Sequence, residues 1–300
     1  ASLLLELDPE GRPNWPLAVG RERRACREAA ALFDQTSFAK FLLQGPDAER
    51  ALGWIAANRV DHAPGRVIYT QMLNDHGGIE CDLTCARVSD DVYYIVTGTG
   101  FATHDFDWIR RNIPSGMNAQ LVDVTSGNAV LSLFGPKARD VLAAATGDDV
   151  SDAAIPFGHW ARIGIAGAPV MALRITYVGE PGWELHFPVE YARAVYDALH
   201  AAGAPHGLTN AGYRAIETLR LEKGFRAWGG DIGPDYTPLE AGLGWALKLR
   251  TNTDFRGRSA VEAQKAKGLN RMLATFTADP DVILYGRETI YRNGERCGYL

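Results

Sequence analysis

Residues 71–84, QMLNDHGGIECDLT, decide the fold of this chain because they predict a β-hairpin. The Gly-Gly pair lies in the predicted turn, where a positive φ carries no Cβ penalty. Side chains alternate on the return strand, so Glu80, Asp82 and Thr84 share one face. Two carboxylates on a buried face would need hydrogen bonds or a ligand, whereas a solvated face would need neither. The pattern alone leaves both interpretations open.

The composition is that of an ordinary globular protein. The chain has 300 residues, of which 46% are hydrophobic and 22% charged. With a net charge of -5 and no run of Lys or Arg, we expect no nucleic-acid partner and no membrane partner. No apolar stretch reaches about 18 residues, and the first residues are acidic rather than basic as in a signal peptide. We therefore expect a cytoplasmic protein.

The four cysteines do not indicate disulfides or a metal site. Cys81 and Cys85 are the only close pair, and on a strand they lie about 13 Å apart at roughly 3.3 Å per residue. That separation is too large for a disulfide or for a shared metal ion. The seven histidines show none of the short spacings typical of zinc sites. We predict reduced thiols and no metal site.

Periodicity and turn residues predict alternating helices and mostly antiparallel strands after an extended arm that includes Trp15. A Gly-Pro turn precedes a helix at both 45–46 and 135–136, which hints at two similar units. A small all-β region begins near residue 268 and looks unfinished. Helices are expected at 19–31, 47–57, 101–112, 137–146, 189–202, 210–222 and 259–267. Strands are expected at 32–33, 40–44, 65–72, 79–84, 91–97, 119–124, 128–134, 160–165, 168–174, 183–188, 272–277, 288–291 and 298–300.

Residues 174–187, RITYVGEPGWELHF, place two aromatic and two acidic side chains around a tight turn. Rings stack on a planar heterocycle and carboxylates accept its N–H groups, so Tyr177 and Glu184 are candidate ligand contacts. In the plainer interpretation, which composition alone favours, the aromatic pair packs in the core and the glutamates are solvated.

Residues 214–232, RAIETLRLEKGFRAWGGDI, are rich in cations. Arg220 could bind a carboxylate with both arms of its guanidinium group. The alternative is a basic helix end that interacts favourably with its own dipole, and this alternative is preferred for Lys223 and Arg226.

Three segments carry a family resemblance, namely GGIECDL at 77–83, TYVGEPGWEL at 176–185 and LRLEKGFRAWGGDI at 219–232. In this order and spacing they closely resemble the folate-binding aminomethyltransferase family typified by the glycine cleavage T-protein. The resemblance is tighter with the tetrahydrofolate-binding C-terminal half of dimethylglycine and sarcosine dehydrogenases and oxidases. Further blocks, among them DVTSGNAVLSLFGPKARDVL and TPLEAGLGWALKL, extend it over about residues 14–300.

The resemblance implies an α+β fold built as a three-part ring of the T-protein type. Its parts are a Greek-key α+β unit, a ferredoxin-like unit and a C-terminal β-barrel, which here looks truncated. We accordingly expect an arm at 1–18, two interleaved α+β subdomains at 19–250, and the incomplete start of the barrel at 251–300.

The resemblance also implies roles for individual residues. Asp82 matches the catalytic carboxylate that lies against the folate. The glycine cleavage proteins have two aspartates here, whereas this chain has Cys81 before Asp82. Glu184 is expected to accept hydrogen bonds from the pterin amino group and a ring nitrogen. The expected folate contacts are Thr84, Tyr177, Glu184, Arg220 and Trp228.

The reaction implied by the resemblance takes a methylene from an amine or iminium of dimethylglycine or sarcosine type and gives 5,10-methylenetetrahydrofolate. No GxGxxG motif follows an early strand, so we expect no FAD site here and a flavin-containing oxidoreductase subunit or domain as partner. The alternatives are a glycine cleavage-type aminomethyltransferase, a folate-dependent demethylase, and a non-catalytic folate-binding regulatory or scaffold protein. Residues 223–226, KGFR, lack the cysteine of the iron–sulfur-cluster repair members, which favours an enzyme.

Overall fold

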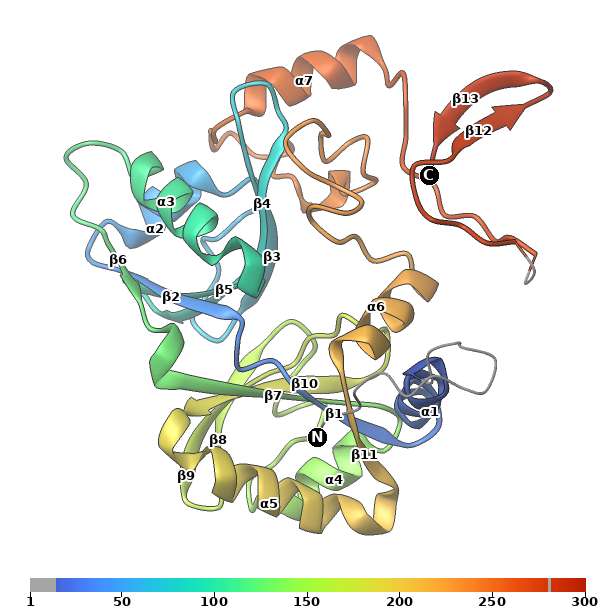
Figure 1. Ribbon diagram of the computed structural model, residues 1–300. Helices are drawn as coiled ribbons and strands as arrows, with labels where there is room; N and C mark the ends of the chain where they lie inside the picture. The colour runs from blue at the N-terminus through green and yellow to red at the C-terminus, as the bar shows by residue number, and fades with distance from the viewer. Residues whose placement is uncertain (1–14, 280–281) are drawn as a thin grey trace.

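The computed structural model describes residues 15–279 and 282–300, whose strands form two large sheets and one small sheet (Figure 1). The six-stranded sheet has the order β11-β1-β7-β10-β9-β8, with strands Leu208–Ala211, Ala30–Asp34, Asn128–Phe134, Gly182–Pro188, Ala168–Leu173 and Trp160–Ile165. The five-stranded sheet has the order β3-β4-β5-β2-β6, with strands Val67–Leu73, Ile79–Ser89, Val92–Thr97, Ala39–Gln44 and Gln120–Asp123. The small sheet pairs β12 (Thr289–Arg292) with β13 (Glu295–Tyr299).

Each large sheet buries one face under a pair of helices. α4 and α5 cover the six-stranded sheet, where Val141 and Leu199 pack in one core with Trp183. α2 and α3 cover the five-stranded sheet, where Leu52 and Ile109 belong to a second core. The α-helices of the described residues are α1 Trp15–Glu28, α2 Ala48–Ile55, α3 Ala102–Asn112, α4 Ala138–Ala145, α5 Ala192–Gly203, α6 Tyr213–Glu222 and α7 Arg258–Lys267.

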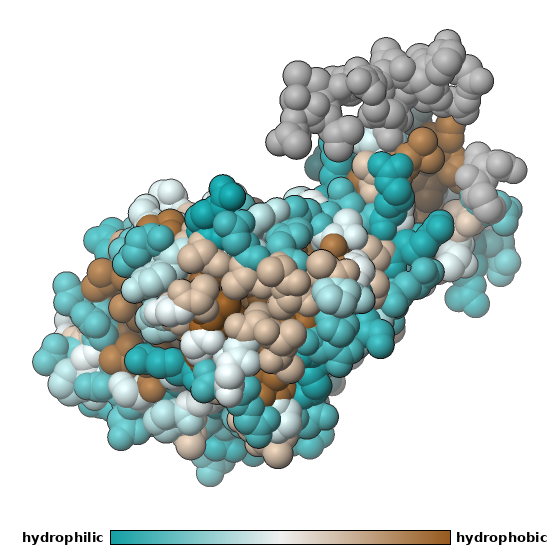
Figure 2. Space-filling view, turned by 90° about the horizontal axis from the view of Figure 1, so that it is seen from below, coloured by the Kyte–Doolittle hydropathy of each residue, from teal (hydrophilic) through white to brown (hydrophobic). Residues whose placement is uncertain are grey.

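The outer surface over α4 and α5 faces solvent. Seen from below, it is a mixture of hydrophilic and pale residues with small brown groups (Figure 2). Helices that turn their apolar side to a sheet and their polar side to water are typical of a layered α+β domain.

The remaining faces of the two large sheets lie opposite each other. Val96 on β5 and Leu173 on β9 belong to one buried cluster, although they come from different sheets. Tyr94 on β5 also reaches across to His186 on β10, whose Nδ1 lies 3.1 Å from the tyrosine oxygen. We call these two surfaces the inner faces. At the β1 end of the six-stranded sheet, helices α1 and α6 cover this face instead, and Phe33 packs there against Cys26 and Leu219.

The chain crosses between the sheets more than once. β1 belongs to the six-stranded sheet and is followed by β2 in the five-stranded sheet, and the chain returns between β6 and β7. The two sheets are therefore interleaved along the sequence, so residues far apart in the chain, such as Tyr94 and His186, face each other.

The two Gly-Pro turns occupy equivalent places in the two layers. Gly45 follows β2 and precedes α2, and Gly135 follows β7 and precedes α4. Their φ angles are 127° and 133°, which only glycine adopts readily. A Cβ at Gly45 would lie 2.4 Å from the carbonyl oxygen of Asn118, and one at Gly135 would lie 2.5 Å from that of Ala29. The repeated dipeptide thus marks a repeated strand–turn–helix connection.

The clearest differences between the structure and the sequence-based expectations lie at three places. The expected arm falls largely on residues 1–14, outside the described residues, and Trp15 begins helix α1 instead of extending the arm. The helix expected from residue 210 begins at Tyr213, because 208–211 form β11, which pairs parallel with β1. The strand expected at 272–277 is wrong, since those residues have no regular structure.

The expected barrel is represented only by the β12–β13 hairpin. No closed barrel forms among the described residues, and the hairpin lies apart from the two large sheets (Figure 1). An isolated two-stranded hairpin buries little apolar surface, which agrees with the exposure of Tyr291 and Tyr299. Within residues 15–279 and 282–300, none of the helices has the length and apolar character needed to cross a membrane.

Candidate functional site

Strand β4 has one polar and one apolar face. Glu80, Asp82 and Thr84 are partly exposed, and the residues between them are buried. Thr84 is the cross-strand neighbour of Val96, which belongs to the buried cluster between the sheets. Cross-strand neighbours share a face of a sheet. Asp82 and Thr84 therefore lie on an inner face, directed at the six-stranded sheet, whereas the carboxylate of Glu80, near the start of β4, reaches His104 of α3.

Asp82 is held by side chains of the neighbouring strand β3. Gln71 lies opposite it in the strand register, and its Nε2 donates to Oδ1 at 2.8 Å. The hydroxyl group of Tyr69 also donates to Asp82. Burial raises the pKa of Asp82 from its usual 3.8 to about 6, although the two hydrogen bonds act to lower it. The carboxyl group can therefore gain or lose a proton close to neutral pH.

Glu184 lies on the inner face of the other sheet. It is the cross-strand neighbour of Leu173, a member of the cluster between the sheets, and it is 8% exposed. Within the described residues no hydrogen bond reaches its carboxylate. The Nε2 of His186 lies 3.5 Å from Oε2, which is long for a hydrogen bond. A buried carboxylate without donors is the kind of group that a ligand's N–H groups would satisfy.

A second acceptor on the inner faces also lacks a donor. Gln71 is fully buried, and its Oε1 has no hydrogen-bond partner among the described residues. A buried polar atom left unpaired costs about 1–3 kcal/mol. A reduced pterin carries several N–H groups along its edges, which are the donors that Gln71 and Glu184 require. The residues present therefore fit a tetrahydrofolate.

Tyr177 and Arg220 lie close together, but their side chains have different hydrogen-bond partners. Tyr177 donates to the carbonyl oxygen of Arg226 at 2.8 Å and stacks on Phe225, with 6.1 Å between the ring centres. The charges of both Arg220 and Asp82 act on its hydroxyl group, so Tyr177 lies within electrostatic reach of the predicted catalytic group. Its ring is thus fixed in position by the segment after α6.

The guanidinium of Arg220 is already paired. It is 4% exposed and donates to Glu217, to Asp231 and to the carbonyl oxygen of Phe225. Only its Nε is buried without a partner within the described part of the chain. These contacts tie helix α6 to the segment that carries Phe225, so its direct contact with folate stays a prediction.

Trp228 packs against the tip of the hairpin. Its indole Nε1 donates to the carbonyl oxygen of Ile79 at 2.8 Å, and its ring meets Phe101 edge-to-face at 4.6 Å. Gly78 supports the same contact region, since a Cβ there would lie 1.8 Å from the carbonyl oxygen of Pro234. Trp228 therefore anchors the 225–236 segment on the hairpin, and its predicted contact with folate stays a prediction.

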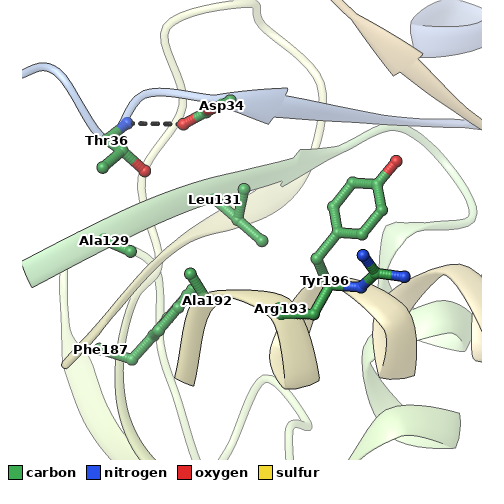
Figure 3. A pocket seen from close by; sticks show the side chains of 8 residues that line it. All are labelled: Asp34, Thr36, Ala129, Leu131, Phe187, Ala192, Arg193 and Tyr196. Atoms are coloured by element: carbon green, nitrogen blue, oxygen red, sulfur yellow. Dashed lines mark hydrogen bonds between the residues drawn. The ribbon is translucent and has the colours of Figure 1, made fainter. Parts of the chain in front are cut away.

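Two surface pockets lie away from these residues. One, of about 220 Å³, lies between β7 and the start of α5, with Asp34, Arg193 and Tyr196 around it (Figure 3). The other, of about 350 Å³, includes Trp54 and Lys248. None of the predicted site residues lines either pocket.

The structure adds residues that the sequence analysis missed. Tyr69 and Gln71 hold Asp82, and the signal was present in the alternation of the strand opposite it. His186 lies beside Glu184 and meets Tyr94 of the other sheet. It alternates with Glu184 along β10, but nothing in the sequence indicates that Tyr94 reaches it.

These features define a class of α+β protein with a polar site between two facing sheets. One sheet carries a carboxyl group that titrates near neutral pH, and the other carries a buried carboxylate that accepts no hydrogen bond within the described residues. The chain belongs to the GCVT N-terminal domain family, whose family model matches residues 7–251. This confirms the resemblance found in the motifs, and the α+β fold of the T-protein type with it.

Individual relatives agree with this assignment. Mouse mitochondrial sarcosine dehydrogenase is 42% identical over 296 residues, which cover 94% of this chain and 32% of the dehydrogenase, so the chain spans about a third of that relative. An aminomethyltransferase of Halothermothrix orenii is 33% identical over 99% of this chain and 82% of its own length. The crystal structure of glycine cleavage system aminomethyltransferase T from Bartonella henselae has a TM-score of 0.72 and 28% identity, covering 88% of this chain and 69% of that one.

Proposed function

We propose that this chain transfers a methylene group to tetrahydrofolate from the iminium that a flavin partner makes by oxidising an N-methylated amine of dimethylglycine or sarcosine type, and that the demethylated amine is released. The observation that carries the proposal is the pair of inner-face carboxyl groups. Asp82 has its pKa raised to about 6, and Glu184 is buried without a donor. The similarity to sarcosine dehydrogenase and to aminomethyltransferases supports the same class of reaction.

Tetrahydrofolate supplies the nucleophilic nitrogens and leaves as 5,10-methylenetetrahydrofolate. Glu184 and Gln71 would hold the pterin through its N–H groups, and Tyr177 would contact its ring. Asp82 would stabilise positive charge near the reacting nitrogen and accept the proton released at Oδ1 or Oδ2. Gln71 and Tyr69 keep that carboxyl group in one orientation, and most of the rate would come from such positioning.

The donor is proposed to reach the site from a flavin-containing oxidoreductase subunit or domain. An iminium hydrolyses in water, so it has to arrive without escaping into solution. A chain tested without such a partner is therefore expected to bind tetrahydrofolate well and to turn over slowly.

The test is titration calorimetry with (6S)-tetrahydrofolate on the wild type, on Glu184→Ala and on Glu190→Ala. Glu190 is the matched control, because it follows the same strand but is exposed. Loss of a charge-assisted hydrogen bond costs about 1.5–3 kcal/mol, so Glu184→Ala should weaken binding roughly 10- to 100-fold. Folded wild-type protein that shows no binding, or equal weakening by both variants, would contradict the proposal.

A further inference from the structure

The opposite side of β4 carries a second cluster of reactive side chains. Cys81, His104 and Asp105 each present one ligand atom, and these three atoms lie within 4.8 Å of one another. Cys81 comes from strand β4, and the other two come from the first turns of α3. Thiol, imidazole and carboxylate are the three ligand types that proteins use for Zn²⁺.

The neighbours of these groups already hold them in place. The imidazole of His104 lies between two carboxylates, with Nδ1 2.9 Å from Oδ1 of Asp105 and Nε2 3.5 Å from Oε2 of Glu80. The hydroxyl group of Thr97 donates to the other oxygen of Asp105. A histidine that binds a metal through one nitrogen usually has its other nitrogen on a carboxylate, which fixes its tautomer and ring orientation. Glu80 supplies that carboxylate.

Aromatic rings hold the imidazole from two sides. The ring of His104 is nearly parallel to that of Trp108, with 6.5 Å between centres, and lies 5.6 Å from that of Trp228. Cys81 and Asp105 are buried, whereas the His104 side chain is 42% exposed. The cluster therefore has two fixed, dry ligands and one edge open to solvent through which an ion could enter.

We propose that Cys81, His104 and Asp105 form a binding site for a divalent cation of the zinc class. The ion would be bound by Sγ, Nδ1 and a carboxylate oxygen, with the fourth tetrahedral position left to water. Binding replaces the thiol proton by the metal, so one proton passes to the buffer for each ion bound. The ion would join β4 to α3 on the side of the strand away from Asp82, and its role does not depend on folate chemistry.

Cobalt(II) is the probe, because a thiolate ligand gives it a charge-transfer band near 350 nm and tetrahedral geometry gives intense bands in the visible range. All variants carry Cys297→Ser, since Cys297 is exposed and would bind cobalt on its own. Cys81→Ser removes the proposed sulfur ligand. Cys85→Ser is the matched control, because Cys85 is an equally buried thiol on the same face of β4.

The proposal expects both bands at one equivalent of cobalt in Cys297→Ser and in the Cys85→Ser control, and their loss in Cys81→Ser. Zinc should bleach the bands and raise the melting temperature. Glu80→Gln should weaken zinc binding roughly 10-fold, the usual size of such an effect. Absence of the bands, or bands that persist in Cys81→Ser, would overturn it and leave a buried thiol hydrogen-bonded to Asp105. If Cys81→Ser does not fold, His104→Gln at the exposed ligand should weaken cobalt binding and the intense visible bands, and an unchanged titration would overturn the proposal.

Discussion

The two faces of strand β4 make different contributions to the molecule. On the inner face Asp82 and Thr84 are partly exposed, and on the other face Leu83 and Cys85 are buried under α2 and α3. Because the side chains alternate, groups that would act on a ligand sit next to groups that hold the layer together. Substitutions one residue apart should therefore separate loss of activity from loss of stability.

The largest effect is expected for Asp82→Asn. The amide keeps the shape of the carboxyl group but cannot accept a proton, so transfer should fall about 10²- to 10⁴-fold. Tetrahydrofolate binding and the fold should be retained, which calorimetry and circular dichroism would check. Asp90→Asn in the exposed turn after β4 is the control and should be unchanged. Transfer at the wild-type rate in Asp82→Asn would sink the catalytic assignment.

The next largest effect is expected for Leu83→Ala, which should lower stability rather than activity. Leu83 is 3% exposed in the core under α2 and α3, and truncating a buried leucine costs about 2–5 kcal/mol of unfolding free energy. Chemical denaturation would measure the loss, and transfer per folded molecule should be nearly unchanged. Thr84→Val, on the other face, should alter stability by less than about 1 kcal/mol. Equal stability losses in the two variants would mean that the two faces are not distinct.

A smaller effect is expected for Gln71→Leu. Leucine keeps the buried volume but removes the donor to Asp82 at 2.8 Å, a hydrogen bond to an ionisable group. Such a bond contributes about 1.5–3 kcal/mol, so kcat should fall roughly tenfold or more. Gln120→Leu, at an exposed position on β6, is the control. A change in KM alone, with kcat intact, would give Gln71 a role in binding only.

The predictable part of the site was local. Alternation placed Asp82 and Thr84 on one face of β4, and motif resemblance pointed to Glu184 on the facing sheet. The helices and most strands followed from periodicity, because each layer buries one apolar face. The prediction of an extended arm at Trp15 was wrong. The helix was expected to begin at residue 19, after Pro16, but it begins at Trp15 and contains Pro16 in its first turn. Proline is favoured in the first turn of a helix.

Contacts between distant segments could not be predicted in the same way. The cluster on the other face joins Cys81 to His104, which lies 23 residues later on a helix, so no spacing rule connects the two. The same limit applies to Arg220: the resemblance predicts a contact with folate, which stays a prediction, and the sequence does not indicate the pairing with Asp231 and Glu217 that the structure shows. Sequence pattern identifies a face, but tertiary packing determines which neighbours satisfy each group.

The smallest effect is expected from a change of pH, which should act in opposite directions on the activity and on the stability that depend on Asp82. Its pKa is raised to about 6, so the carboxylate that transfer requires is lost below pH 6, and kcat/KM should fall about tenfold per pH unit there. The sign for stability is opposite. A carboxyl group whose pKa is raised by folding favours the folded state below its unfolded pKa of 3.8, and this contribution disappears as pH rises through 6. Asp82→Asn should therefore be more stable than the wild type above pH 6, by an amount that shrinks towards pH 4. A wild type that retains full activity at pH 5, or a variant with the same stability difference at pH 5 and pH 8, would show that Asp82 does not titrate near neutrality.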